Sequence, residues 1–195
     1  MTSSAADPIL RFQRWFAQAR AAGMLQPDAM ALATADALGR PSVRMVLLKQ
    51  ADRDGFVFYT NSRSRKGRDV RDNPRAALVI HWDRLGKQVR VEGRIEPVTE
   101  AEADAYWATR PRESQLAAVA SDQGAPLRSR AALVAKWRAL ARRTRGAPVP
   151  RPSHWTGYRI VPAAIEFWTH RDHRLHDREL FTRRGRAWQR IRLQP

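Results

Sequence analysis

Short runs with strand character, separated by turn-forming residues, recur along most of this chain and restrict what it can fold into. Each run is rich in apolar residues and is bounded by Gly, Pro, Asn or Asp, a pattern typical of β-strands. The predicted strands cover residues 29–36, 41–49, 55–60, 75–82, 87–98, 157–161, 164–170, 178–182 and 187–192. The spacing is not that of β–α–β units, and no glycine-rich dinucleotide fingerprint is present. The sequence therefore predicts a mainly-β α+β fold, an antiparallel barrel with peripheral helices.

Four helical segments are predicted around these strands, at residues 7–22, 64–72, 99–114 and 127–145. In the first, Asp7-Pro8 has the form of an N-cap followed by proline in the first turn, and Gly23 ends the helix. The third begins with a capping box and breaks at Pro111.

The domain prediction is a single domain over residues 1–195, because neither an internal repeat nor a second domain is visible. Residues 146–153 then form a proline-rich connector within that domain.

Composition excludes several classes of protein. There is no cysteine, which excludes disulfides, thiolate metal sites and a cysteine nucleophile. No apolar run reaches the roughly 18 residues of a membrane span, and the N-terminus lacks the pattern of a signal peptide. We therefore expect a soluble cytoplasmic protein without a membrane partner.

The formal charge of +17 is compatible with binding to nucleic acid. However, only four of the 36 basic residues are lysine, and the charges are spread along the chain rather than gathered in one tail. The excess of arginine over lysine partly reflects the overall composition of the chain and is not specific to binding a polyanion. Small phosphorylated molecules are equally compatible with the positive charge.

Arg44 lies inside the predicted strand 41–49, whose residues 43–48 are otherwise apolar, and a charge there is costly unless it is paired or binds a ligand. Strict alternation would place Arg44 and Lys49 on opposite faces, so both reach one ligand only if the strand twists or ends near Lys49. We interpret Arg44 as the first indication of an anion site.

Two further segments have the chemistry of anion sites. Arg65 and Lys66 stand at a predicted helix start, where cations are unfavourable and backbone N–H groups favour phosphate; an ordinary basic helix start is the alternative. Tyr106, Arg110 and Ser114 could converge at the break around Pro111, or could be a helix surface.

The segment 174–178 (RLHDR) is predicted to be extended. Arg174, His176 and Arg178 would then share one face, suited to anions and to an electron-rich ring. The alternative is a solvated basic strand.

With these segments in place, the chain resembles the pyridoxine/pyridoxamine 5′-phosphate oxidase family. The resemblance covers nearly the whole chain, and its motifs keep the family's order and spacing. They are residues 44–49 (RMVLLK), 58–61 (FYTN), 64–66 (SRK), 73–75 (NPR), 110–115 (RPRESQ), 166–168 (EFW) and 174–178 (RLHDR).

The resemblance implies an FMN-binding split β-barrel with Greek-key topology, and a homodimer with FMN at the interface. The residues implied to bind FMN are Arg44, Met45, Val46, Leu47, Leu48, Lys49, Tyr59, Thr60, Arg65, Lys66, Gln88, Gln123, Gly124, Trp168 and Arg178. Those implied to bind substrate are Lys49, Tyr106, Arg110, Ser114, Arg174 and His176, with Arg174 and His176 as the catalytic pair.

The implied activity is that of a pyridoxal 5′-phosphate synthase. Pyridoxamine or pyridoxine 5′-phosphate is oxidised at C4′, the flavin accepts the hydride, and O2 reoxidises it to give H2O2, with ammonia released from the amine.

Two features depart from the family. A longer N-terminal arm with Arg and Tyr often covers the substrate, whereas this chain starts close to its first predicted helix. Gly124 stands where a serine hydroxyl is common, so a backbone group is expected to contact the FMN phosphate there.

The sequence allows three other interpretations. His170, His173 and His176 do not share one face of a strand, so we expect no metal site. A phenazine-biosynthesis type of flavin oxidase would share the FMN residues, but the substrate set argues against it. A non-catalytic nucleic-acid-binding module would be colourless and would bind with a steep salt dependence.

Overall fold

The computed structural model describes residues 7–195, which divide into two compact units. Unit 1 comprises residues 7–58, Asp69–Glu96 and Arg159–Pro195; unit 2 comprises Tyr59–Arg68 and Pro97–Tyr158. Strand β4 (Gly55–Asn61), helix α2 (Arg65–Asp72) and strand β7 (Trp155–Thr169) contribute residues to both. The single domain over residues 1–195 stays a prediction.

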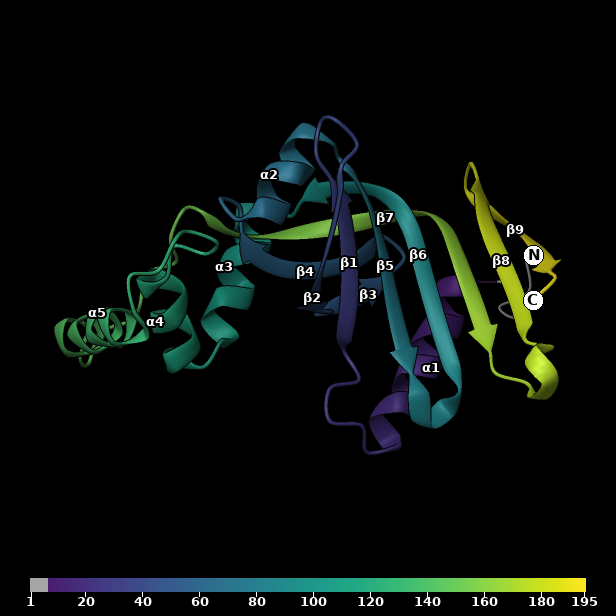
Figure 1. Cartoon of the computed structure of the whole chain (residues 1–195), viewed down its shortest axis with the longest axis horizontal. Coiled ribbons are helices and arrows are strands. Elements are labelled where there is room, and N and C mark those ends of the chain that lie inside the picture. Colours follow the sequence, from purple (N-terminus) through teal and green to yellow (C-terminus); the bar gives the residue numbers. More distant parts are fainter. Residues whose placement is uncertain (1–6) are drawn as a thin grey trace. The chain divides into compact units, whose positions relative to one another are not determined.

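Most of the sheet belongs to unit 1 (Figure 1). Its strands in chain order are β1 (Ala29–Ala35), β2 (Pro41–Leu47), β3 (Gln50–Asp52), β4, β5 (Arg75–Trp82), β6 (Lys87–Pro97), β7, β8 (Asp177–Arg184) and β9 (Ala187–Leu193). Their order in the sheet is β2-β1-β5-β6-β7-β4-β3, with β8 paired to β7 and β9 to β8. Neighbours such as β1 and β2, β5 and β6, and β8 and β9 pair antiparallel, which confirms the predicted class.

Period-two burial gives this sheet a core face. In β1, Met30, Leu32 and Thr34 are buried, whereas the residues between them are partly exposed. Helix α1 (Pro8–Ala21) covers part of the core: the Phe12 ring lies 4.9 Å from that of Phe56. Its bounds agree with the predicted helix 7–22, and its N-cap Asp7 accepts from the amide of Ile9 at 2.8 Å, as the sequence predicts.

Two strand predictions are wrong in detail. Segments 157–161 and 164–170 form one continuous strand, β7, although Pro162 lies inside it and cannot donate to a ladder. Gly93 on β6 allows β7 to approach closely, because a Cβ at Gly93 would overlap the carbonyl oxygen of Val161. The short strand β3 was not predicted, since three residues carry too little pattern to identify a strand.

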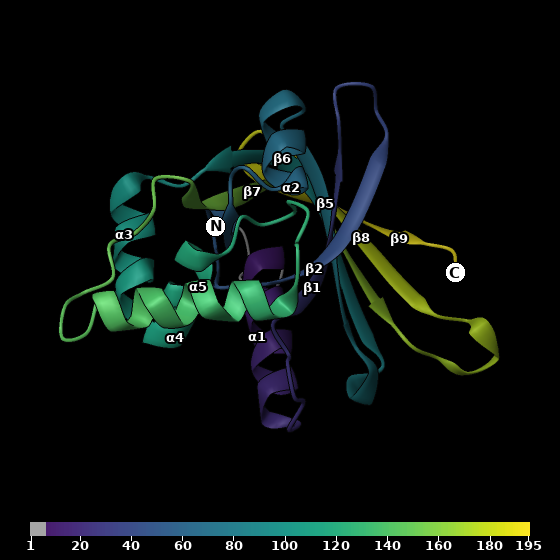
Figure 2. The same ribbon diagram turned by 60° about the vertical axis from the view of Figure 1, so that its left-hand side comes forward.

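Unit 2 is mainly helical, with α3 (Glu100–Thr109), α4 (Arg112–Ala120), α5 (Arg130–Arg143) and the start of α2. Figure 2 shows α4 and α5 side by side. Their core contains Trp107, Leu116, Leu140, Val149 and Trp155. The predicted capping box of α3 is present, and the chain breaks between α3 and α4 at Pro111 as predicted.

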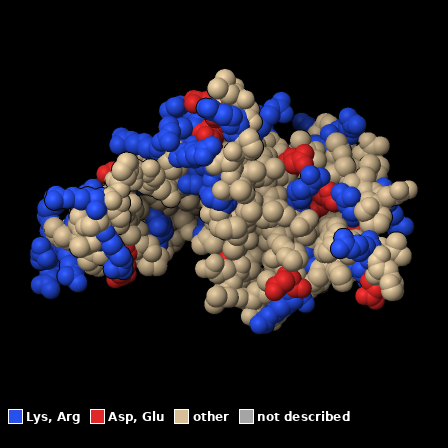
Figure 3. Space-filling view, viewed as in Figure 1, with Lys and Arg blue, Asp and Glu red and all other residues tan. Residues whose placement is uncertain are grey.

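Residues 146–153 lie between α5 and β7 and form neither helix nor strand. Within residues 7–195, none of the helices has the length and apolar character needed to cross a membrane. Lys and Arg side chains are distributed over many elements of the face shown in Figure 3, as the sequence indicates.

Candidate functional site

Unit 2 contains a pocket of about 630 Å³ that brings together several predicted site residues. Its polar lining includes Thr60, Asn61, Arg110, Ser114 and Gln123. Its apolar lining includes Tyr59, Leu133, Val134, Trp137 and Trp155. An apolar cavity with a few convergent polar groups is the usual form of a small-molecule site.

Arg110 is a charged residue of this pocket with an unsatisfied hydrogen-bond donor. Its Nη1 atom is buried and, among the described residues, has no hydrogen-bond partner. The guanidinium lies 4.7 Å from the ring centroid of Trp155 and 5.3 Å from that of Trp107. Burial lowers the pKa of Arg110 from its ordinary value, and Tyr106 partly offsets this. A buried donor without an acceptor is costly, so an anionic ligand at Nη1 would remove that cost.

Aromatic rings form a wall beside Arg110. Tyr59 stacks on Tyr106 at 4.0 Å and on Trp155 at 5.3 Å between ring centroids. Gly157 makes this possible, because a Cβ there would overlap the Tyr59 ring. The structure therefore places Tyr106 in the stack; among the described residues it is not part of the pocket lining. Arg110 and Ser114, in contrast, both line the pocket, and their role in substrate binding stays a prediction.

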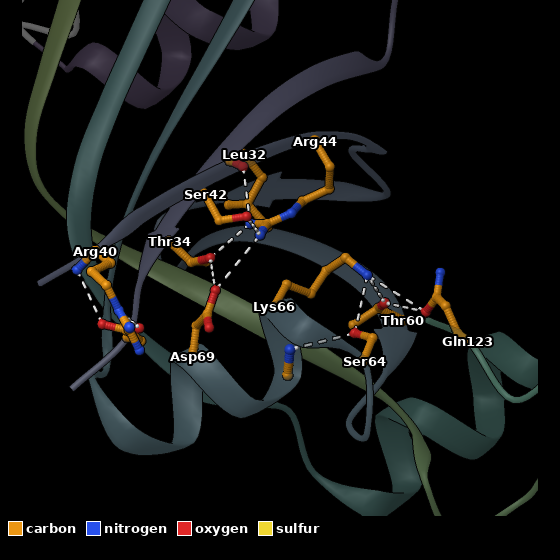
Figure 4. A network of polar contacts seen from close by, with 12 residues as sticks. Leu32, Thr34, Arg40, Ser42, Arg44, Thr60, Ser64, Lys66, Asp69 and Gln123 are labelled. Carbon is orange, nitrogen blue, oxygen red and sulfur yellow. Dashed lines mark hydrogen bonds and ion pairs between the residues drawn. The ribbon is translucent and has the colours of Figure 1, made fainter. Parts of the chain in front are cut away.

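Lys66 lies buried in the first turn of α2, also in unit 2 (Figure 4). Its Nζ donates to Thr60 Oγ1 at 3.0 Å, to Ser64 Oγ at 3.1 Å and to Gln123 Oε1 at 3.5 Å. The structure thus brings together Thr60, Lys66 and Gln123, and their role in FMN binding stays a prediction. Arg65 is exposed, and the exposed Gly124 has a φ of +90°, a conformation that favours glycine.

Arg44 in unit 1 is held by oxygen atoms from its own strand and from neighbouring elements (Figure 4). Nη1 donates to Leu32 O at 3.2 Å and to Thr34 Oγ1 at 2.7 Å, and Nη2 donates to Ser42 Oγ at 2.8 Å. Nη2 also lies 3.6 Å from Asp69 Oδ2. The charge of Arg44 in this apolar strand is therefore paired, which offsets the free-energy cost of removing it from water.

The exposure of the other side chains in segment 44–49 follows the alternation of a strand. The side chains of Met45 and Leu47 are exposed, that of Val46 is half-buried and that of Leu48 is buried. Lys49 follows β2, and its Nζ lies 3.0 Å from Asp28 Oδ2. The strand ends before Lys49, which is the condition under which Arg44 and Lys49 were expected to reach one ligand.

A second charged cluster in unit 1 is centred on the buried Glu166 of β7. Its carboxylate accepts from Arg178 Nε at 2.7 Å and from Arg90 Nη2 at 2.8 Å. Burial alone would raise the pKa of Glu166, but the bonds from Arg178 and Arg90 outweigh it and hold the pKa below its ordinary value.

The predicted cofactor residues Gln88, Trp168 and Arg178 lie on this part of the sheet. Trp168 pairs with Arg178 across β7 and β8, and Gln88 is two residues before Arg90 on β6. Sequence reasoning missed the roles of Glu166 and Asp69. A carboxylate in the apolar run 165–168 was the available signal for Glu166, because such a group is buried only when paired.

The predicted extended face of segment 174–178 is wrong. Arg174 ends a 3₁₀ turn (Asp172–Arg174), and both His173 and Arg174 have positive φ values, 55° and 62°. Strand β8 begins only at Asp177, so Arg174, His176 and Arg178 do not share a strand face. An ion pair between Arg171 Nε and Asp177 Oδ2, at 2.7 Å, closes the loop.

Within this loop, His176 is half-buried and its ring lies 4.6 Å from that of Trp168. Its Nδ1 accepts from the backbone amide of Arg171 at 3.1 Å. In the neutral imidazole the proton therefore resides on Nε2, which becomes a donor. Arg174 is exposed. Within residues 7–195, no group of His, Cys, Asp or Glu side chains has the arrangement of a metal site.

Comparison with known proteins gives matches over nearly the whole chain. Residues 16–142 match a family model described as pyridoxamine 5′-phosphate oxidase. Residues 155–195 match one described as pyridoxine 5′-phosphate oxidase C-terminal dimerisation region.

Similar full-length proteins include two pyridoxine/pyridoxamine 5′-phosphate oxidases. That of Rubrobacter xylanophilus is 55% identical, with 97% of this chain and 87% of that protein covered. That of Anaeromyxobacter dehalogenans is 53% identical, with 99% and 98% covered.

Two solved structures are also similar. PhzG from Burkholderia lata, in complex with tetrahydrophenazine-1-carboxylic acid, superposes with a TM-score of 0.93 at 36% identity, covering 97% of this chain and 93% of that one. A pyridoxamine 5′-phosphate oxidase-related, FMN-binding protein from Nostoc punctiforme gives 0.78 at 18% identity, with 94% and 97% covered, and shows the shared fold.

Proposed function

The chain belongs to the pyridoxine/pyridoxamine 5′-phosphate oxidase family of oxidoreductases and has its split-barrel fold, and from this premise we propose its reaction. The reaction is FMN-dependent oxidation of pyridoxamine 5′-phosphate or pyridoxine 5′-phosphate to pyridoxal 5′-phosphate. O2 is the electron acceptor, so H2O2 is released, together with ammonia when the amine is the substrate.

The observation that carries this proposal is the buried Arg110 Nη1 atom, for which the described residues supply no acceptor. A substrate phosphate would supply oxygen acceptors, and a guanidinium matches them with two parallel N–H donors. Ser114 lines the same pocket from the first turn of α4 and adds a hydroxyl. We assign Arg110 and Ser114 to the substrate phosphate, and we add Lys49 and Tyr106 on the family resemblance alone.

The donor set also fits FMN. Lys66, the hydroxyl groups of Thr60 and Ser64, and the start of α2 form a cationic, donor-rich environment of the kind that binds phosphate. The cofactor residues that we propose are those expected from the sequence: Arg44 to Lys49, Tyr59, Thr60, Arg65, Lys66, Gln88, Gln123, Gly124, Trp168 and Arg178. When bound, FMN supplies the hydride acceptor of the reaction.

Arg174 and His176 are proposed to act on the substrate ring. The Arg171 amide fixes the His176 tautomer with Nε2–H as donor, suited to hold a ring oxygen or nitrogen. Arg174 would contribute positive charge beside the electron-rich ring. Both groups would orient the substrate, because the cofactor performs the redox chemistry.

A homodimer with FMN at its interface completes the proposal. The match to the dimerisation-region model covers β7, β8 and β9. Sedimentation of the purified protein is expected to give twice the chain mass.

Aerobic turnover tests the proposed reaction. FMN-loaded protein is mixed with pyridoxamine 5′-phosphate, and pyridoxal 5′-phosphate and H2O2 are measured together. We expect equal amounts of both, and much slower turnover of unphosphorylated pyridoxamine. FMN-loaded protein that forms no pyridoxal 5′-phosphate would contradict the assignment.

The two arginines of segment 174–178 are expected to have different roles. Arg174→Ala should lower kcat about tenfold with FMN still bound, because it removes an orienting contact with substrate. Arg178→Ala should mainly weaken FMN retention, since Arg178 lies in the Glu166 cluster beside Trp168. Flavin absorbance after gel filtration, together with initial rates, separates the two effects, and a swapped outcome would show that the division is wrong.

A second candidate function follows from the similarity to PhzG, whose structure holds a tricyclic carboxylic acid. A tetrahydrophenazine-carboxylic acid would place its carboxylate at Arg110 and its rings against Trp155 and Trp137. Assays of both substrate classes under the same conditions decide between them. A kcat/KM that favours the tetrahydrophenazine-carboxylic acid would select the second function.

A further inference from the structure

A buried hydroxyl and a buried carboxylate lie next to the Arg44 guanidinium in unit 1 (Figure 4). Thr34 on β1 is 3% exposed and Asp69 on α2 is 5% exposed. The Thr34 hydroxyl donates to Asp69 Oδ2 at 2.6 Å and accepts from Arg44 Nη1 at 2.7 Å. Thr34 therefore connects the carboxylate to the guanidinium through a single oxygen atom.

Strand register explains why these groups meet. β1 and β2 pair antiparallel, with Thr34 opposite Ser42 and Leu32 opposite Arg44. Arg44 and Ser42 are two residues apart and share a face, so Arg44 Nη2 reaches Ser42 Oγ at 2.8 Å. With the ion pair to Asp69, groups from β1, β2 and α2 fix the position and plane of the guanidinium.

We propose that Thr34 and Asp69 are positioning residues for the FMN-binding Arg44. This inference rests on the proposed function, in which Arg44 contacts FMN. A free arginine side chain loses rotamer freedom when it binds an anion, whereas one already held by hydrogen bonds loses little. Asp69 holds the cation through charge, and Thr34 sets its orientation, because a hydroxyl between two charged groups requires one geometry.

Thr34 differs from its buried neighbours in the core. Thr34 is buried in a strand whose other buried residues, Met30 and Leu32, are apolar. A valine at position 34 would fill the same volume and would remove both hydrogen bonds. A serine would keep the hydroxyl, so the pair of variants separates hydrogen bonding from packing.

The test measures FMN binding to the full-length apoprotein. Quenching of flavin fluorescence reports the binding and gives the Kd. Thr34→Val is expected to raise the Kd for FMN about tenfold, the usual effect of losing a hydrogen bond to a charged group. Thr34→Ser is expected to restore the Kd to within about twofold of the wild-type value. Thr182→Val on β8, a strand threonine outside this network, is the matched control and should leave the Kd unchanged.

Thermal unfolding of the same apoproteins separates positioning from a structural role. If Thr34→Val lowers the Tm but leaves the Kd for FMN unchanged, the positioning role is overturned. If Thr34→Val does not fold, Ser42→Ala removes another acceptor of Arg44 and should raise the Kd about threefold; an unchanged Kd would again overturn the role. Wild-type apoprotein that takes up no FMN would instead contradict the proposed function.

Discussion

Replacing Arg110 by alanine is expected to lower kcat/KM for pyridoxamine 5′-phosphate about 100-fold, mostly through KM. Truncating one partner of a buried charge pair costs about 2–5 kcal/mol, or about 30-fold to several-thousand-fold, and the expected 100-fold loss lies within these limits. The Arg110 guanidinium is suited to such a pair, because its Nη1 is buried and the described residues leave it without an acceptor. FMN binding should change little, since the proposed cofactor contacts lie on other residues.

Substrate comparison makes the Arg110 prediction specific. Wild-type protein should strongly prefer pyridoxamine 5′-phosphate to pyridoxamine, and Arg110→Ala should lose most of that preference. Arg138→Ala, an exposed position on α5, is the matched control and should keep it. If Arg110→Ala retained the full preference for the phosphorylated substrate, the phosphate would have to bind elsewhere.

Lys66→Met is expected to raise the Kd for FMN about 100-fold, through loss of a buried cation beside an anionic ligand. Methionine preserves the length and apolar stem of lysine, so the packing of α2 should be maintained. Arg65→Met, the exposed neighbour in the same turn, should have a much smaller effect. Equilibrium titration of apoprotein with FMN measures both, and equal effects of the two substitutions would show that burial of Lys66 is unimportant for binding.

Local sequence signals predicted most of the secondary structure. The N-cap at Asp7, the capping box at Thr99 and the break at Pro111 all appear at the predicted residues. Each depends on hydrogen bonds or steric limits within a few residues, so it can be read from a short stretch of sequence. The convergence of Arg110 and Ser114 on one pocket followed from that break.

The predictions failed where geometry depends on distant contacts. Segment 174–178 alternates like a strand, yet its first residue, Arg174, and the preceding His173 take left-handed backbone angles, and an Arg171–Asp177 ion pair closes the loop. Non-glycine residues rarely adopt such angles, so the residue types in this segment do not predict them. Likewise, the partners of Arg44 and Arg178 are Asp69 and Glu166, which come from other elements.

The resemblance to a family supplied what the residues alone could not. Charge and spacing indicated anion sites at Arg44, Lys66 and Arg110, but not which anion binds at each. The structure adds the burial of Lys66 and the unsatisfied Nη1 of Arg110, on which the proposed anion sites at these two positions rest. The division between cofactor and substrate remains part of the proposed function.

Anaerobic reduction tests the central claim most directly. FMN-loaded protein is mixed with pyridoxamine 5′-phosphate in the absence of O2, and the flavin absorbance and pyridoxal 5′-phosphate are followed together. We predict loss of the oxidised flavin spectrum with one pyridoxal 5′-phosphate formed per FMN, and recovery of the spectrum when O2 is admitted. An oxidised flavin spectrum that persists at saturating pyridoxamine 5′-phosphate would contradict the account.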